Sequence, residues 1–400
     1  MYSKTDVMEF ISENDVKFIR LAFCDVFGTQ KNISIQPCLL EEAFETGIPV
    51  NSSLIAGFGG KTAPDVCLVP DPTTMSVLPW RPSTGRVVRL FCHLHTPSGT
   101  PFEPDARRIL RETVKKMRES ALSVYLGAEC EFYLFKTDEN GNPTDIPLDE
   151  GGYLDLAPAD RGENVRREIC FTLQEMSIQP ESSHHENGPG QNEIDFRASD
   201  PLTSADNVTT FKNVVQTVAQ KNGLHARFDP KPLAENDGNG LHINIRLSSA
   251  DKTVKDAFLA GILRRIREMT LFLNPDESSY KRLSDCACTK SINWGHTHSN
   301  LIRVIGDDSA GLLFEICSPD CLANPYIAYT LVLNAGLEGV CGRLPLSEPL
   351  ESGFDKAQNV PGLPESLAEA AKEALASDFV KSVLPEKLIR AYAARAGIRL

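Results

Sequence analysis

Acidic side chains inside apolar, strand-like segments constrain this chain more than any other feature. Glu129 and Glu131 are separated by one residue in the segment SVYLGAECEFYLF. Because successive side chains of a strand point to opposite faces, these two carboxylates lie on the same face. The flanking Leu126 and Phe132 argue against a freely solvated pair of glutamates. Two neighbouring negative charges need a positive partner, so the segment predicts a sheet with a cation-binding face.

Further candidate ligands occur in similar surroundings along the chain. Glu186 and Glu193 flank a Gly-Pro-Gly turn in HHENGPGQNEIDF, His242 alternates with apolar residues in LHINI, and Glu315 lies in LLFEIC. Each residue alone also fits an exposed acid, a satisfied core histidine or a turn. Together they form an oxygen-rich set of ligands, which suits Mg²⁺ or Mn²⁺ better than zinc.

The periodicity of apolar residues predicts an α+β protein with two domains, residues 1–100 and 101–400. A hairpin is predicted for residues 16–35, and short strands continue to about residue 97, where the turn-rich segment TPSGTPFEPD provides a linker. Beyond it, helical and strand-like patterns alternate. We expect helices over 105–120, 203–223, 253–275 and in the tail from about residue 363, and strands over 123–135, 191–197 and 241–247.

Charge and composition exclude several classes of partner. The 400 residues include 54 acidic and 41 basic side chains, and the net charge of −13 would repel nucleic acid and anionic membrane surfaces. The first residues do not resemble a signal peptide and no long apolar run occurs, so we expect a cytoplasmic protein. The 11 cysteines are scattered and show no CxxC pairs, which favours reduced thiols over a disulfide or zinc framework.

The ordered motifs resemble those of the glutamine synthetase family over nearly the whole chain. AECEF is similar to the family's Glu-x-Glu strand, HHENGPGQNEID to its His-His-Glu and Gly-Gln-x-Glu segment, and NGLHINI to its Gly-x-His strand. SSYKRL and EICSPDCLANPYIA resemble two later segments, and KFIRLAFCDVFGTQK resembles the N-terminal hairpin. This resemblance implies a β-grasp domain followed by a catalytic domain with a curved, mostly antiparallel sheet flanked by helices.

The resemblance also implies a ligand set and a reaction. One divalent ion would be held by Glu131, Glu186 and Glu193, and a second by Glu129, His242 and Glu315, with two or three Mg²⁺ or Mn²⁺ ions per site. In the family these ions clamp ATP while a glutamate carboxylate is phosphorylated and then joined to ammonia or an amine. The remaining residues expected at the site are Arg282 and Arg303 for substrate and phosphate, Asn51 and Asp65 on the ammonium side, and Arg303, Phe196 and Asn244 for the nucleotide. A homo-oligomer of stacked rings with active sites between subunits is also implied.

Several substrate-handling positions depart from the family pattern. Asn51 stands where the family has an aspartate that attracts ammonium, and SDCACTKSINW lacks the glutamate of the closing flap. A phosphate-facing arginine is replaced near His298, and Cys317 stands where the family has a glutamate-binding arginine. The approach to Glu315 carries acids in place of lysine and arginine. These losses weaken the recognition of carboxylate and phosphate groups.

The sequence leaves three hypotheses open. The first is an ATP-dependent ligase that joins a small carboxylate to an amine with altered specificity. The second is a metal-binding paralogue without catalysis that acts in assembly or sensing. The third is a metal-dependent enzyme that no longer uses ATP, since ATP binding is the least supported part of the expected chemistry.

Overall fold

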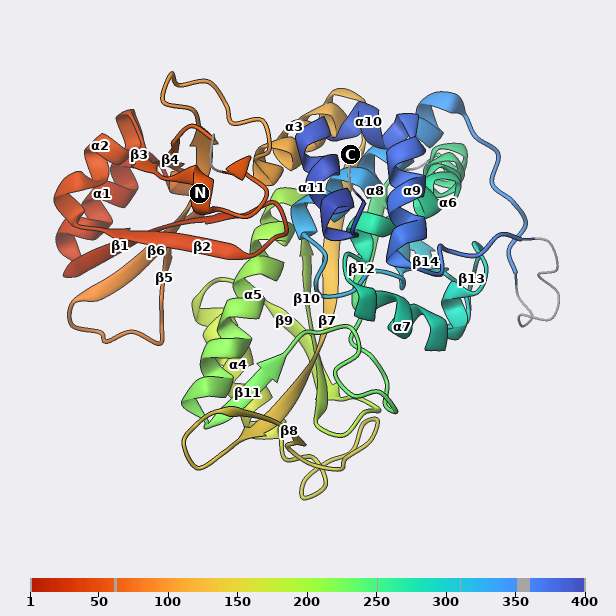
Figure 1. The fold of residues 1–400 in the computed structure, drawn as a ribbon, viewed down its shortest axis with the longest axis horizontal. Helices are drawn as coiled ribbons and strands as arrows, with labels where there is room; N and C mark the ends of the chain where they lie inside the picture. The colour runs from red at the N-terminus through yellow and green to blue at the C-terminus, as the bar shows by residue number, and fades with distance from the viewer. Residues whose placement is uncertain (1, 61–62, 250, 310, 351–359, 399–400) are drawn as a thin grey trace.

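The computed structural model describes residues 2–60, 63–249, 251–309, 311–350 and 360–398. Two sheets organise these parts of the chain, a six-stranded sheet in the N-terminal part and a nine-stranded sheet in the rest. Figure 1 shows the N-terminal domain at one side of the molecule and the longer strands and most helices at the other.

The N-terminal sheet has the strand order β2-β1-β6-β4-β3, with β5 paired to β6. The hairpin of β1 and β2 is antiparallel, as predicted, whereas β1 and β6 are parallel. Helix α1 starts with a capping box at Ser3, in which the side chains of Ser3 and Asp6 satisfy each other's backbone N–H groups. The elements are α1 (Lys4–Glu13), β1 (Val16–Cys24), β2 (Gln30–Ile35), α2 (Leu40–Glu45), β3 (Ile48–Val50), β4 (Val66–Pro70), β5 (Ser76–Val77) and β6 (Arg86–His95).

The second sheet has the order β13-β14-β15-β12-β7-β10-β9, and β8 and β11 also pair with β7. Its described pairs are antiparallel except β13 with β14. The strands are β7 (Ser123–Thr137), β8 (Pro143–Pro147), β9 (Pro180–His185), β10 (Gln191–Ser199), β11 (Leu224–Arg227), β12 (Leu241–Ser248), β13 (Trp294–Gly295), β14 (Ile302–Asp308) and β15 (Gly311–Ile316).

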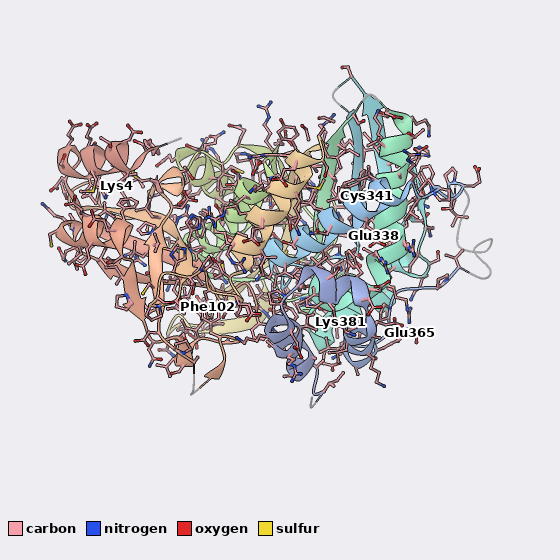
Figure 2. The ribbon with its side chains drawn as sticks, turned by 90° about the horizontal axis from the view of Figure 1, so that it is seen from above. Lys4, Phe102, Glu338, Cys341, Glu365 and Lys381 are labelled. Atoms are coloured by element: carbon pink, nitrogen blue, oxygen red, sulfur yellow. The ribbon has the colours of Figure 1, made fainter. Side chains whose placement is uncertain are left out.

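Helices cover this sheet and bury its apolar face. Helix α8 packs against α6 and α3, and α5 packs against β7 and β11. Figure 2, seen from above, places Lys4 at the outer end of the β-grasp domain and Glu338 and Lys381 toward the opposite end. The helices are α3 (Ala106–Glu119), α4 (Glu163–Glu175), α5 (Pro201–Lys221), α6 (Lys252–Leu273), α7 (Glu277–Asp285), α8 (Pro325–Gly342), α9 (Leu367–Ala376), α10 (Asp378–Val383) and α11 (Glu386–Arg395).

The predicted α+β architecture is confirmed, although some elements were not assigned from the sequence. Helix α8 is almost apolar all around, so its sequence lacks the amphipathic period that signals a surface helix. It begins where the side chain of Asn324 accepts a hydrogen bond from the N–H of Tyr326, and Pro325 occupies the first turn. This helix is buried between α3 and α6 and forms the centre of the helical layer.

A buried ionic cluster connects the two domains. The guanidinium of Arg107 on α3 contacts both carboxylate oxygens of Asp206 on α5 and also lies 3.0 Å from Asp71 of the β-grasp domain. Tyr326 donates a hydrogen bond of 2.7 Å to the same Asp206. Because each charge is paired and hydrogen-bonded, the cluster satisfies the condition under which buried ions are tolerated.

Candidate metal centre

Strand register places five of the six predicted ligands on one face of the second sheet, and Glu186 follows the end of β9. Glu131 on β7 is directly opposite Glu193 on β10, and Glu129 on β7 is directly opposite His242 on β12. Glu315 on β15 is opposite Asn244, which is two residues beyond His242 on the same strand. Since residues two apart share a face, the acids gather from four neighbouring strands.

His242 is the centre of the first group of ligands. Its Nδ1 lies 2.8 Å from Oε1 of Glu315 and 3.2 Å from Oε2 of Glu129. Nε2 of the same ring is 3.7 Å from Oε1 of Glu131. Asn244 donates a hydrogen bond of 2.7 Å from Nδ2 to Oε1 of Glu129, which fixes the orientation of that carboxylate.

The charges of this group shift the pKa values of its members. Burial raises the pKa of Glu315, but the hydrogen bond from His242 and the charges of His242 and Arg303 outweigh burial and lower it to about 2. Burial lowers the pKa of His242, yet its contacts with Glu129 and Glu315 raise it well above the ordinary value. The carboxylates therefore stay ionised beside a positive group.

Glu131 connects the first group of ligands to the second. Its Oε2 accepts hydrogen bonds of 3.0 Å from Nε2 of Gln191 and 3.0 Å from the backbone N–H of Gly240. Oε1 is not engaged in these bonds and faces His242. Burial raises the pKa of Glu131, and the nearby charge of Glu186 adds to that effect.

The second group is assembled around His184, which the sequence analysis noted only as a neighbour of Glu186. Its Nδ1 lies 3.2 Å from Oε1 of Glu186, and its Nε2 lies 3.5 Å from Oε1 of Glu193. Hydrogen bonds with these two acids raise the pKa of His184 to about 11. Asp195, a further acid that the sequence analysis missed, shares the face of Glu193; its position two residues further along the same strand was the signal available for it.

These residues fit divalent cations. One ligand atom each from Glu129, His242 and Glu315 lies within 4.8 Å of the other two, and the same holds for His184, Glu193 and Asp195. The ligands are mainly carboxylate oxygens with an imidazole, a set that suits Mg²⁺ or Mn²⁺. A cation here would also offset the repulsion among the neighbouring acids.

A third cluster of similar composition has a structural role. His185, Asp149 and Asp160 are completely or almost completely buried, and Nε2 of His185 lies 2.9 Å from Oδ1 of Asp149. Asp149 also accepts hydrogen bonds from the backbone of Arg161 and Gly190. The carboxylate oxygens of Asp149 therefore hold the loop before α4 against β9 and the start of β10.

Arg282 lies beside the first group of ligands. It donates hydrogen bonds of 2.9 Å to the carbonyl of Ser318 and 3.1 Å to the carbonyl of Cys317, which uses two of its five N–H donors. A Cβ atom at Gly240 would lie 2.8 Å from both Nη2 of Arg282 and Nε2 of His242. Glycine at this position thus lets the guanidinium and the imidazole approach the same backbone.

Arg303 is held against a predicted ligand. Its Nε and Nη2 both lie 2.6 Å from Oε2 of Glu315, and its Nη1 lies 2.8 Å from Nε2 of His298. Glu315 therefore has one oxygen toward His242 and the other toward Arg303. This guanidinium, on β14, lies at the edge of the sheet face that carries the predicted metal ligands.

Three of the predicted site residues lie elsewhere in the single chain. Asn51 and Asp65 are exposed in the β-grasp domain, where Asn51 accepts hydrogen bonds from the N–H and the hydroxyl of Ser53. The side chain of Phe196 is buried against Phe211 on the face opposite Glu193, and the contact of this residue with a nucleotide stays a prediction. The alternation of β10 directs Phe196 into the core.

Comparison with known proteins identifies the family. The model of the glutamine synthetase catalytic domain matches residues 103–397, and that of the glutamine synthetase β-grasp domain matches residues 15–97. The chain belongs to the glutamine synthetase family. Among the described residues, no helix is long and apolar enough to cross a membrane.

Relatives of this glutamine synthetase family member match it almost from end to end. The glutamine synthetase of Methanosarcina mazei is 42% identical over 412 residues, covering 98% of this chain and 92% of the relative. That of Clostridium saccharobutylicum is 39% identical, with coverages of 98% and 94%. A solved GmaS/ADP complex is 26% identical, has a TM-score of 0.87 and covers 98% of this chain and 94% of its own.

The positions at which this glutamine synthetase family member departs from the motif pattern lie in different surroundings. Cys317 is buried and follows the end of β15, with its carbonyl bonded to Arg282. The loop after α7 brings Sγ of Cys286 within 2.7 Å of Sγ of Cys288. Asp307 on β14 forms an ion pair of 2.5 Å with Lys255 on α6, so this acid is engaged away from the ligands.

Proposed function

We propose that this protein is an ATP-dependent ligase that joins a small carboxylate to an amine through an acyl phosphate. The observation that carries this proposal is that five of the six predicted ligands share one sheet face across β7, β10, β12 and β15, with Glu186 near them through His184. The family relationship supports the reaction type. Glu131, Glu186 and Glu193 would hold one ion, and Glu129, His242 and Glu315 the other.

In this reaction a substrate carboxylate oxygen attacks the γ-phosphorus of ATP, and ADP leaves. The nitrogen of the amine then attacks the acyl carbon, and inorganic phosphate leaves. Bound Mg²⁺ or Mn²⁺ would supply charge neutralisation for the phosphate groups. Arg282 retains unused N–H donors beside the ligands and would bind an anionic group, whereas Arg303 and Gln191 orient Glu315 and Glu131.

Altered substrate specificity belongs to the same proposal. Asn51 cannot supply the negative charge that favours ammonium, so an organic amine is the better candidate. Cys317 cannot form the two-pronged hydrogen bond that an arginine gives to a carboxylate, which favours an acid other than glutamate. The exposed position of Asn51 and Asp65 supports a homo-oligomer in which the β-grasp domain of one subunit borders the site of its neighbour.

The test follows inorganic phosphate release from ATP with Mg²⁺ or Mn²⁺ over a panel of carboxylates and amines. Release that requires one acid and one amine establishes the ligase and names its substrates. Glu131→Gln should abolish it, because the variant loses one ligand charge while Gln191 and Gly240 still hold the side chain. Glu139→Gln, an exposed acid in the turn after β7, is the matched control and should retain activity.

A second candidate is a metal-binding protein without catalysis. It is favoured by the position of Arg303, whose guanidinium is engaged by Glu315 and His298. Calorimetric titration tests the ligase: metal binding without ATP binding would reject it and leave the non-catalytic paralogue or a metal-dependent enzyme that does not use ATP.

A further inference from the structure

A small cavity between the two domains contains guanidinium groups without acidic partners. Arg20 on β1, Arg89 on β6 and Arg81 after β5 line it from the β-grasp side, and α5 closes it from the catalytic side. No aspartate or glutamate belongs to its described lining. Figure 1 shows α5 running beside the strands of the β-grasp sheet at this junction.

The strand register forces two of these charges together. Arg20 and Arg89 are directly opposite each other on the parallel strands β1 and β6. Like charges in such positions destabilise a sheet. Burial lowers the pKa of Arg89 to about 10, and burial together with the charge of Arg81 lowers the pKa of Arg20. The protein thus holds positive charge where both solvation and repulsion oppose it.

Neighbouring groups do not neutralise this charge. Arg89 is only 8% exposed; it donates a hydrogen bond of 2.6 Å from Nη1 to the hydroxyl of Thr210 and stacks over Phe91 at 4.1 Å. Its Nε and the Nε of Arg20 are buried without a hydrogen-bond partner. Asp206, whose charge acts on Arg89, is already bound by Arg107 and Tyr326. Buried donors without partners cost free energy, so they indicate a missing acceptor.

The cavity has the size and the donors for a small anion. Its volume is about 120 Å³, below the ~300 Å³ at which pockets for drug-sized ligands begin. Thr210, Asn213 and Thr217 line it from α5 and are spaced three and four residues apart, so they share one helix face. Thr210 donates its hydroxyl hydrogen to the carbonyl of Asp206, so the donors on the α5 side are Asn213 and Thr217. Together with the guanidinium groups on the other side they match phosphate or carboxylate oxygens.

We propose that this cavity is a binding site for a small anion that carries a phosphate or carboxylate group, held between the β-grasp sheet and α5. The site is separate from the metal ligands on β7, β10, β12 and β15. Because its walls come from both domains, an occupied site fixes the β-grasp domain to the catalytic domain. Its existence does not depend on the ligase reaction.

The test is calorimetric titration of the full chain with inorganic phosphate and, separately, with succinate. EDTA and constant ionic strength in chloride exclude binding through metal ions and general screening. Arg20→Gln and Arg81→Gln should each raise Kd about tenfold, the effect of losing roughly one charge-assisted hydrogen bond. Lys17→Gln on β1 removes the same charge from an exposed side chain and should leave Kd unchanged.

Each outcome decides the proposal. Binding of phosphate alone assigns the site to phosphate or a phosphate ester, binding of succinate alone assigns it to a dicarboxylate, and binding of both supports the shared chemistry. Failure of both anions to bind at 10 mM, an order-of-magnitude limit that corresponds to roughly 3 kcal/mol, would overturn it. Binding that is unaffected by Arg20→Gln and Arg81→Gln, or equally weakened by Lys17→Gln, would also overturn it. Thermal melting of the variants without anion checks that each is folded.

Discussion

Nδ1 of His242 lies 2.8 Å from Oε1 of Glu315 and 3.2 Å from Oε2 of Glu129, so a single imidazole nitrogen on β12 contacts carboxylates on both neighbouring strands. The acids repel one another, and the ligand atoms of Glu129, His242 and Glu315 lie within 4.8 Å of one another. A divalent ion bound by these atoms would offset this repulsion. The relationship between these residues therefore links metal binding to stability.

Mn²⁺ or Mg²⁺ should raise the thermal unfolding temperature. At a metal concentration 100 times Kd, binding at one site should increase the free energy of unfolding by about 2.7 kcal/mol. Differential scanning calorimetry with and without EDTA measures it. Glu315→Gln should reduce the shift, whereas Glu139→Gln should preserve it. An unfolding temperature that is indifferent to both metals would count against the candidate metal centre.

Gly240→Ala should weaken metal binding and leave the fold intact. The added Cβ would lie 2.8 Å from Nη2 of Arg282 and from Nε2 of His242, so both side chains must move. We expect Kd for Mn²⁺ to rise roughly 10–100-fold, the range seen when the partners that orient metal ligands are disturbed. Gly306→Ala on β14 is the control, since its Cβ would have no heavy atom within 4 Å. Equal Kd values in the two variants would contradict this account.

His93 should make the protein less stable below neutral pH. Burial and the charges of Arg111 and Arg107 lower its pKa to about 4, against about 6.5 in the unfolded chain. Between these values the unfolded chain binds a proton that the folded chain does not, so stability is present above pH 6.5 and is lost as pH falls toward 4. The loss is about 1–3 kcal/mol. Urea unfolding at several pH values should show that the free energy of unfolding depends less on pH in His93→Gln than in the unchanged protein. An identical pH dependence in the two proteins would reject this assignment.

Asp206→Asn should destabilise the domain junction strongly. The variant leaves the buried guanidinium of Arg107 with one fewer compensating charge and disturbs the hydrogen bond from Tyr326. Breaking a buried pair in this way costs about 3–5 kcal/mol. Asp256→Asn removes the partner of the exposed Lys252 and should cost less than about 1 kcal/mol. Chemical denaturation measures the free energy of unfolding of both variants. Similar losses would show that the buried cluster contributes no more to stability than the exposed ion pair.

Much of the candidate site followed from spacing. The period of two placed Glu129 beside Glu131, and the Gly-Pro-Gly turn placed Glu193 at the start of a strand, because these relationships are local. His184 was missed since a histidine in a short strand is common, and only the register of β9 with β10 makes it a neighbour of Glu193. Asp195 was missed although its position two residues after Glu193 on β10 was a local signal. The burial of the Phe196 side chain against Phe211 was not predicted, because family resemblance does not state which face of a strand a side chain occupies.

The sequence by itself determined the family, the α+β architecture and the oxygen-rich chemistry of the ligands, since periodicity and motif order are properties of neighbouring residues. Only the tertiary structure decided which charges meet. Strand register set Arg20 against Arg89 and brought His242 between Glu129 and Glu315. Interstrand pairing joins residues far apart in the chain, and its free energy depends on the packing of the whole sheet, which no local pattern specifies.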